Sequence, residues 1–339
     1  MRLEVTERTV AFRPPLRTSY GVLRERTLFD VLLIGDDGVA GRGEAAPLEP
    51  YDGVSDGEVR AALRAYAEAL GALGPDAEGV IVLDTCRAAA DLPQALAAID
   101  LALWDRAGLR SGRPVAELLT DDPLAAVPVN ATVDAADRAG AARACGEAVA
   151  AGFTCVKLKV GVGDDPGRVA AARAAAGPHV DLRLDANGAW EVEEAVRMIE
   201  VLASAGLELV EEPVHGIRAI REVRDRVPVR IAMDETGDEP GAIASGAADA
   251  VCLKVARRGG ISGLLATAAL ARATGAEVYL ASTFDGPLGI AAAVHCAAAL
   301  RVQAPCGLAT LTLLDLPVPG ALEVRDGTIS VPRGPGLLP

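Results

Sequence analysis

The distribution of apolar and polar residues divides the chain into two parts. From about residue 125 onward, short runs rich in β-branched residues alternate with alanine-rich stretches whose apolar residues recur at helical spacing, as in 191–206. Strands that alternate with helices in this way indicate a parallel sheet with helices outside it. The predicted strands are 127–133, 154–160, 181–186, 207–212, 229–234, 250–254 and 277–282, with a short eighth at 306–310.

These repeats predict an α/β fold, a modified (β/α)8 barrel of the form (β/α)7β, over residues 125–310. A doubly wound sheet is the alternative, and it is weakened because no glycine-rich nucleotide loop follows the first strand.

Residues 1–124 have a different pattern. They alternate as antiparallel strands do, with a tight turn at 36–38, and then predict two helices, 56–73 and 92–108. A second hairpin pattern at 321–332 has the same strand character. We therefore expect an α+β capping domain over 1–124 that residues 311–339 complete.

Polar side chains fall at or just past the carboxyl end of most of the predicted barrel strands. Catalytic residues of such barrels lie at these ends, because the loops that follow the strands form the active site. In chain order the residues are Lys157 and Lys159, Asp185 and Asn187, Glu211 and Glu212, Asp234 and Glu235, Lys254, and Ser282 with Thr283.

The stretch "CVKLKVG" (155–161) places two lysines in a strand that is otherwise apolar. Strand side chains alternate, so Lys157 and Lys159 share one face, and the apolar residues between them fit the helix-facing side. A buried ammonium group needs a carboxylate partner or a depressed pKa. Lys159 can therefore be a general base whose pKa is lowered by Lys157, and Lys254 arrives from the opposite side of the ring.

Three acids on consecutive strands, Asp185, Glu211 and Asp234, can converge on one point. Such oxygen ligands suit Mg²⁺, with Mn²⁺ as the alternative ion. No Cys or His accompanies them in the pattern, which argues against a soft or nitrogen-rich site. Each acid alone could be a helix N-cap or an arginine partner, and Lys254 alone could be a strand-end lysine with its head in water. Their common position at the ends of consecutive strands favours a functional site.

Composition narrows the choice of partner and compartment. The chain has 33 Lys+Arg against 47 Asp+Glu and a net charge of −14, which argues against nucleic acid or an anionic membrane surface as a partner. No run of about 20 uncharged apolar residues predicts a membrane span. Six scattered cysteines without a CxxC pair predict free thiols in a reducing compartment, and the first residues do not form a signal-peptide pattern. We expect a cytoplasmic protein, and the sequence leaves a homo-oligomer open.

The motifs also resemble those of the enolase superfamily, in its muconate-lactonizing-enzyme subgroup, over nearly the whole chain. "VKLKVG" resembles the paired-lysine motif of the second strand. "LRLDANGAW", "LVEEPV" and "IAMDETG" resemble the three metal-ligand segments, and "CLKVARRGGI" resembles the segment of the opposing lysine. The resemblance implies that Lys159 is the base, that Lys254 is its partner, and that Asp185, Glu211 and Asp234 bind Mg²⁺, which stabilises an enediolate. None of His179, His215 and His295 follows a strand as the histidine base of a mandelate racemase would.

Within the subgroup, 127–133, 281–300 and 306–310 resemble o-succinylbenzoate synthases. That resemblance implies dehydration of a small carboxylate, 2-succinyl-6-hydroxy-2,4-cyclohexadiene-1-carboxylate, to 2-succinylbenzoate in menaquinone biosynthesis. An N-succinylamino acid racemase, a dipeptide epimerase and a muconate-type cycloisomerase stay open on the same scaffold, as does a catalytically silent binding protein. The loops 13–23 and 48–53 are candidate lids. Residues expected to contact substrate or to flank the ligands are Asn130, Asn187, Glu235, Ser282 and Thr283.

Overall fold

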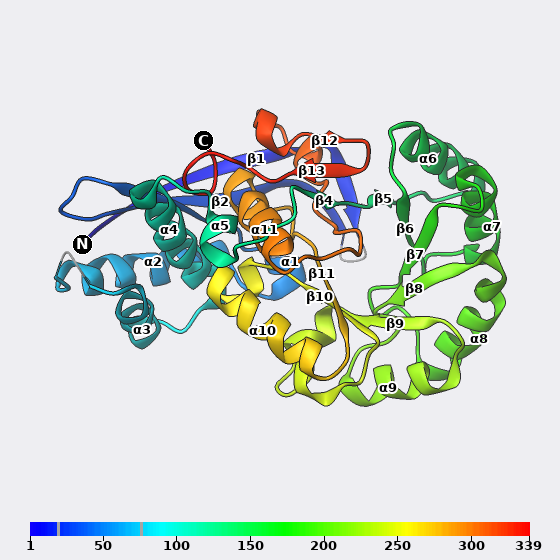
Figure 1. Cartoon of the computed structure of the whole chain (residues 1–339). Helices are drawn as coiled ribbons and strands as arrows, with labels where there is room; N and C mark the ends of the chain where they lie inside the picture. The colour runs from blue at the N-terminus through cyan, green and yellow to red at the C-terminus, as the bar shows by residue number, and fades with distance from the viewer. Residues whose placement is uncertain (19–20, 75–76) are drawn as a thin grey trace.

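The computed structural model describes residues 1–18, 21–74 and 77–339, and its ribbon separates a sheet-and-helix capping part from a barrel (Figure 1). The strands are β1 (Arg2–Thr18), β2 (Gly21–Ile34), β3 (Ala40–Ala45), β4 (Ala126–Pro128), β5 (Ala131–Val133), β6 (Cys155–Lys159), β7 (Asp181–Asp185), β8 (Leu207–Glu211), β9 (Arg230–Met233), β10 (Ala250–Leu253), β11 (Glu277–Leu280), β12 (Val324–Arg325) and β13 (Thr328–Ser330). The α-helices are α1 (Glu49–Asp52), α2 (Asp56–Gly71), α3 (Gly79–Ala89), α4 (Pro93–Ser111), α5 (Val115–Leu119), α6 (Arg138–Ala150), α7 (Asp165–Ala176), α8 (Val192–Leu202), α9 (Ile217–Arg226), α10 (Ile261–Ala273) and α11 (Pro287–Ala299).

The capping part is an antiparallel sheet in the order β1-β2-β3, with helices packed on one face. Glycines on β3 allow its close approach to α4, because a Cβ at Gly41 or Gly43 would come within 2.0 or 1.9 Å of a carbonyl oxygen of that helix. The loop predicted at 13–23 is in fact the end of the β1–β2 hairpin, apart from Ser19 and Tyr20, which lie outside the described residues.

Helix α3 was not predicted from the sequence. Its run "GVIV" is β-branched and looks like strand locally, but Val82, Leu83 and Cys86 lie at helical spacing and pack in the core of the capping part. Tertiary packing of this stripe therefore outweighs the local strand propensity.

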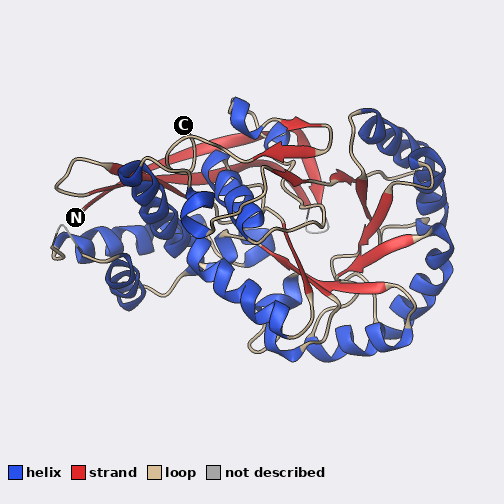
Figure 2. Cartoon of the chain, viewed as in Figure 1, coloured by secondary structure: helices blue, strands red, loops and turns tan. Residues whose placement is uncertain are grey.

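The barrel matches the predicted fold. Seven parallel strands run in the order β5 to β11, and the helices α6 to α11 lie outside them (Figure 2). The predicted eighth strand contributes only isolated parallel bridges at Cys306 and Gly307. Cys306 N–H donates to Pro128 O at 2.8 Å, and Gly307 N–H donates to Leu280 O at 2.7 Å. These two residues join the first and last strands and close the ring.

The C-terminal hairpin differs from expectation. Strand β12 pairs with β13, and β13 pairs with Ala126–Pro128 of β4, next to the barrel, so the hairpin does not join the sheet of β1–β3. The residues on either side of the hairpin do reach the capping part: Asp315 N–H donates to Ala11 O at 2.8 Å, and Leu337 N–H donates to Asp105 Oδ1 at 2.7 Å. The division into 1–124, 125–310 and 311–339 stays a prediction.

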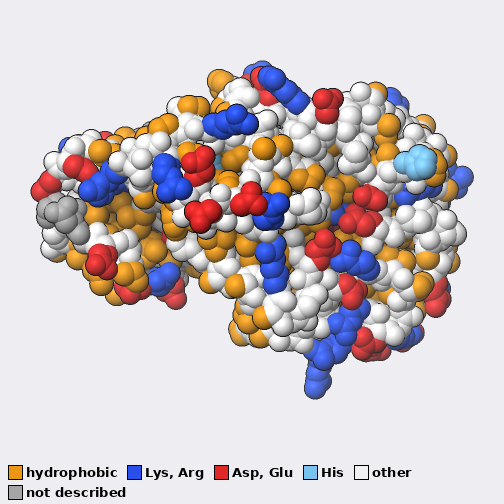
Figure 3. All heavy atoms as spheres, in the orientation of Figure 1, with side chains coloured by type: hydrophobic (Ala, Val, Ile, Leu, Met, Phe, Trp, Pro, Cys, Tyr) orange, Lys and Arg blue, Asp and Glu red, His pale blue; other side chains and the backbone are white. Residues whose placement is uncertain are grey.

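Two hydrophobic clusters support the barrel. One lies within the barrel, where β5–β9 pack against α6–α9, and it includes Leu158, Leu184 and Val210. The other joins β10, β11, α10 and α11 to Leu101 of α4 and to the C-terminal tail. On the face seen in Figure 3, acidic and basic side chains are interspersed over both parts. None of the described helices is long and apolar enough to span a membrane.

Candidate active site and metal centre

The predicted lysines and acids lie inside the barrel, at the carboxyl ends of their strands. Lys159, Asp185 and Glu211 stand at one level of neighbouring strands, since Lys159 pairs with Asp185 and Asp185 pairs with Glu211. The residues that alternate with them pack in the helix-side core. The alternation of the sequence therefore places the charged groups on the inner face.

Lys157 and Lys159 share one carboxylate oxygen. Asp185 Oδ2 lies 2.8 Å from Lys157 Nζ and 2.6 Å from Lys159 Nζ. Lys157 also reaches Glu211 Oε1 at 2.7 Å, and Lys159 reaches Asn187 Oδ1 at 2.6 Å. The side chain of Lys159 is 31% exposed and that of Lys157 only 13%, so Lys159 is the lysine that faces the open end of the barrel.

Charge pairing outweighs burial for Lys157 and Asp185 but not for Glu211. Burial alone would lower the pKa of Lys157, but the carboxylates of Asp185 and Glu211 raise it overall. Burial would raise the pKa of Asp185, and the two lysines hold it below its ordinary value. For Glu211 burial prevails and the pKa is raised. Lys157 is therefore a fixed cation beside Lys159, as the base hypothesis requires.

Lys254 lies on the other side of the acids and is bound by the capping part as well as by the barrel. Its Nζ donates to Asp234 and, at 2.7 Å, to the hydroxyl of Tyr51, which itself donates to Asp234 Oδ2 at 3.0 Å. Burial opposes the charge, but Asp234 raises the pKa of Lys254 well above its ordinary value. A buried, paired ammonium group of this kind is suited to stabilising negative charge.

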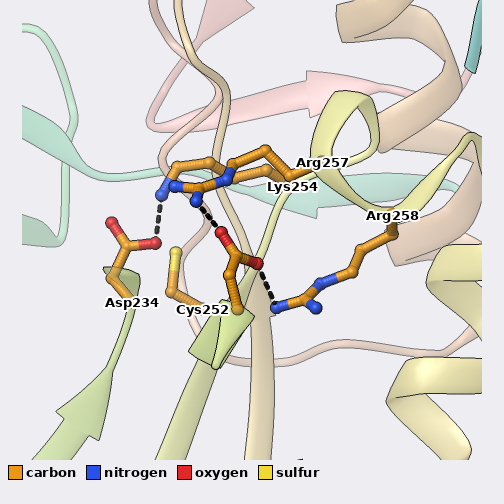
Figure 4. Close-up of a pocket in the computed structure, with 6 residues that line it drawn as sticks. Asp234, Cys252, Lys254, Arg257 and Arg258 are labelled. Atoms are coloured by element: carbon orange, nitrogen blue, oxygen red, sulfur yellow. Dashed lines mark hydrogen bonds and ion pairs between the residues drawn. The ribbon is translucent and has the colours of Figure 1, made fainter. Parts of the chain in front are cut away.

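Figure 4 shows the pocket next to this pair. It is lined by Asp234, Asp238, Cys252, Lys254, Arg257 and Arg258. Asp238 forms ion pairs with both arginines, and the guanidinium of Arg257 also lies over the ring of Tyr51 at 4.8 Å. The two arginines are thus held in the pocket lining by Asp238, and Arg257 also contacts the capping part through Tyr51.

The acids fit a hard divalent cation. Glu211, Asp234 and Cys252 each place a ligand atom within 4.8 Å of the others, all three buried. The expectation that no cysteine accompanies the acids was wrong, because Cys252 lies two residues before Lys254 on β10 and so faces inward too. Burial raises the pKa of its thiol well above the ordinary value. The carboxylates of Asp185, Glu211 and Asp234 are therefore the donors that would hold the ion.

Glu212 and Glu235, the second acids of each pair, have different surroundings. Glu212 has a φ of 40°, a strained value for this residue, and its carboxylate accepts from Asp234 N at 2.8 Å and Thr236 N at 2.9 Å. It therefore fixes the backbone at Asp234. Glu235 accepts from Asn187 Nδ2 at 3.0 Å, its Oε2 has no partner among the described residues, and burial, with Asp234 next, raises its pKa to about 8.

The remaining predicted contacts lie next to the first and last strands of the barrel, where the ring closes. Asn130 is buried at the break between β4 and β5, with its Nδ2 3.4 Å from Thr132 Oγ1. Ser282 Oγ is 2.8 Å from Thr310 Oγ1. Thr283 points elsewhere: it donates to Asp285 Oδ1 at 2.9 Å, where the barrel meets the capping part. No bond links these three to the lysines and acids within the described part of the chain.

Sequence reasoning missed several side chains that complete the site. Tyr51 bonds Lys254 and Asp234, and Cys252 faces the acids. The hydroxyl of Tyr279 donates to Glu211 Oε2 at 2.8 Å, and Arg183, which is paired with Glu208, lies over the ring of Tyr279. A further signal was present in the composition: the chain contains only three lysines, Lys157, Lys159 and Lys254, and uses arginine for every other cationic side chain except histidine. Because arginine cannot give up its proton in proteins, retention of lysine at these three positions indicates chemistry that needs an amine.

The families and proteins to which this chain is similar are those that its sequence motifs resemble. Residues 140–338 match the enolase C-terminal domain-like family, and residues 1–120 match the N-terminal domain of mandelate racemase and muconate lactonizing enzyme. The chain is 41% identical to the o-succinylbenzoate synthase of Thermobifida fusca (strain YX) over 61% of this chain and 69% of that protein. It is 30% identical to the L-Ala-D/L-Glu epimerase of Bacillus subtilis (strain 168) over 99% of this chain and 95% of that protein.

Solved structures agree in fold. A substrate-liganded complex of the Bacillus subtilis epimerase superposes with a TM-score of 0.90, at 29% identity, over 99% of this chain and 97% of that one. The dipeptide epimerase of Enterococcus faecalis V583, complexed with Mg and the dipeptide L-Leu-L-Tyr, superposes with a TM-score of 0.89, at 26% identity, over 99% and 98%.

Proposed function

Because the chain belongs to the enolase superfamily, we propose that it is a lyase that removes the proton α to a carboxylate with Lys159 and dehydrates 2-succinyl-6-hydroxy-2,4-cyclohexadiene-1-carboxylate to 2-succinylbenzoate. The observation that carries the proposal is the pair of lysines, Lys159 and Lys254, on opposite sides of one set of buried acids. Similarity to the Thermobifida fusca synthase supports the choice of substrate.

Each residue has a role in this scheme. Lys159, as the neutral amine, takes the α-proton, and the resulting ammonium returns a proton to the departing hydroxyl so that water leaves and the ring becomes aromatic. Lys254 stays protonated and stabilises the negative charge of the deprotonated substrate. Asp185, Glu211 and Asp234 would hold Mg²⁺, which would supply further positive charge to stabilise the deprotonated substrate.

A second candidate is racemization or epimerization of an N-acylated amino acid or a dipeptide. The Bacillus subtilis epimerase, which matches nearly the whole chain, favours it. In that reaction Lys254 would exchange a proton on the second face of the substrate, where the synthase uses it only as a cation. The first proposal includes a role in menaquinone biosynthesis and a cytoplasmic location. Six buried free cysteines support the cytoplasmic location.

The test is a substrate panel with the purified protein. Absorbance would follow dehydration of the cyclohexadiene acid, and NMR in D₂O would follow α-proton exchange of N-succinyl amino acids and of L-Ala-L-Glu. Dehydration faster than exchange with the amino acid substrates is expected. Exchange without any dehydration would support the racemase in place of the synthase. If the protein catalyses neither reaction, both proposals fail.

Divalent-ion dependence tests the acids in the same assay. EDTA should abolish turnover, and Mg²⁺ or Mn²⁺ should restore it. Asp234→Asn should weaken ion binding and turnover more than Glu235→Gln, since the carboxylate of Asp234 is taken as the ligand. Full turnover in chelator, or the reverse order of the two variants, would contradict these assignments.

A further inference from the structure

Beneath the proposed metal ligands, the barrel interior holds an arginine that none of the roles above uses. Arg183 lies on β7, two residues before Asp185, and its side chain is 0% exposed. Its guanidinium donates twice to Glu208, at 2.6 Å from Nε to Oε2 and 2.9 Å from Nη2 to Oε1, and Nη1 donates to Pro305 O at 2.6 Å. A buried charge needs such a partner, so Arg183 and Glu208 fix each other in one position.

An irregularity in β8 makes this pair geometrically feasible. Glu208 and Glu211 are three residues apart and would face opposite sides of a regular strand. The register between β7 and β8 shifts, because Leu182 pairs with Leu207 and Arg183 pairs with Leu209. Glu208 is the extra residue of a β-bulge, and it turns inward toward Arg183 while Leu207 and Val210 remain in the helix-side core.

The pair is connected to Glu211 by a tyrosine. The guanidinium of Arg183 lies 4.8 Å from the ring centre of Tyr279 on β11, and the Tyr279 hydroxyl donates to Glu211 Oε2 at 2.8 Å. The other oxygen of Glu211 accepts from Lys157 at 2.7 Å. Both oxygens of this carboxylate are therefore fixed by protein donors, and its orientation depends on where the ring of Tyr279 lies.

We propose that Tyr279, supported by Arg183 and Glu208, is a positioning residue for Glu211 and thereby sets the affinity of the site for its divalent ion. The inference rests on the proposed function, in which Glu211 is an ion ligand. Residues that hydrogen-bond a metal ligand typically change the affinity by about 10- to 100-fold when they are replaced. Arg183 acts on Glu211 only through the ring of Tyr279.

The test uses Tyr279→Phe, which removes the hydroxyl and keeps the ring that stacks on Arg183. The dissociation constant for Mn²⁺, measured on the metal-free protein by electron paramagnetic resonance, should rise about tenfold. The matched control is Tyr66→Phe in the capping part, because its hydroxyl is likewise buried and donates to Ala90 O at 2.7 Å. Tyr66→Phe should leave the Mn²⁺ affinity unchanged. Unchanged affinity in Tyr279→Phe, or an equal loss in the control, would overturn the proposal.

A second pair of variants tests the route through the ring. Arg183→Lys keeps the charge but loses the planar fork and the stack, and it should also weaken Mn²⁺ binding. Added to Tyr279→Phe, it should cause no further loss, because the route to Glu211 is already broken. If the losses in Mn²⁺ affinity from the two substitutions add fully, Arg183 acts independently of Tyr279, and its proposed supporting role is overturned. If the unaltered protein binds no Mn²⁺ at all, the proposed metal site fails, whereas normal binding in every variant refutes the positioning role alone.

Discussion

The half of the barrel that carries Lys157, Lys159, Asp185 and Glu211 has a hydrophobic core of its own, whereas the half that carries Lys254 shares its core with the capping part. In Figure 1 the first half lies away from the capping sheet, and α10 and α11 lie toward it. The lysines differ accordingly. Lys159 is 31% exposed and, among the described residues, is bound by Asp185 and Asn187 of the barrel, while Lys254 is 6% exposed and is bound by Tyr51 of the capping part.

This difference suggests how proton transfer and charge stabilisation are separated. A general base must reach the substrate and lose its proton, and the more open lysine is placed for that. A stabilising cation must keep its proton, and burial beside a carboxylate with a tyrosine partner achieves this for Lys254. Substitutions on the two sides should therefore have different consequences.

The largest effect is expected at Lys159. Lys159→Ala should lower turnover by at least about 10²- to 10⁴-fold, because removal of a general base typically costs that much. Lys159→Arg should be equally inactive, since it restores the cation and not the base. Both activity and α-proton exchange in D₂O would be measured by NMR. Substantial activity in Lys159→Arg would mean that Lys159 acts through its charge alone.

At Lys254 the expected effect depends on the reaction. Lys254→Arg keeps a cation beside Asp234 and should retain dehydration to within about tenfold, while any racemization is lost because arginine does not exchange its proton as a base. Absorbance and NMR would follow the two reactions on one preparation. Racemization of an N-succinyl amino acid by this variant would show that the opposing lysine has been wrongly assigned.

Tyr51 tests the link between the capping part and Lys254. Tyr51→Phe removes the hydroxyl that bonds Lys254 and Asp234. Hydrogen bonds to charged groups contribute about 1.5–3 kcal/mol, and with the lower end of this range kcat/KM should fall about tenfold. Tyr66→Phe is again the matched control: it should lower the free energy of unfolding and leave kcat/KM unchanged. If Tyr51→Phe and Tyr66→Phe have the same kcat/KM, the proposed functional role of Tyr51 is wrong.

The smallest effect on activity is expected at Glu44, on β3, where the capping part meets α11. Its carboxylate accepts from Gly286 N at 2.7 Å, and Arg8, Arg26, Asp30 and Asp285 face it. Burial, followed by Asp285 and Asp30, raises its pKa from 4.5 to about 7. The folded state therefore binds more protons than the unfolded state between these values, and stability should fall by at most about 3 kcal/mol as the pH rises through this window.

Glu44→Gln keeps an acceptor for Gly286 and does not titrate. It should flatten the decline in the free energy of unfolding between pH 4.5 and 7 and leave turnover nearly unchanged. Urea unfolding at several pH values would compare the two proteins. An unaltered slope in the variant would place the pH dependence elsewhere.

The sequence predicted those features that depend on local periodicity. The strands, their polar ends and the inward direction of Lys157 and Lys159 all depend on alternation, and the structure has them in those places. The side chains that complete the site depend on contacts between distant segments. Tyr51 lies in α1, within a segment that the sequence indicated only as a candidate lid, and Tyr279 lies in a strand whose pairing alone brings it to Glu211.

Irregular backbone geometry was the other feature that could not be predicted from the sequence. Regular alternation places Glu208 outside the barrel, and only the one-residue bulge turns it toward Arg183. The pairing of the hairpin strand β13 with β4 likewise depends on register, which strand character alone does not determine.

The three lysines at the barrel mouth have a practical consequence for chemical labelling. Together with the amino group of Met1, they are the only primary amines in the 339-residue chain. Reagents that acylate or reductively methylate amines should therefore modify the Met1 amine and, within this site, Lys159 before the two more buried lysines. The same feature means that immobilisation through lysine would attach the protein by its own reaction centre, so a tether through the N-terminus or an introduced surface cysteine is preferable.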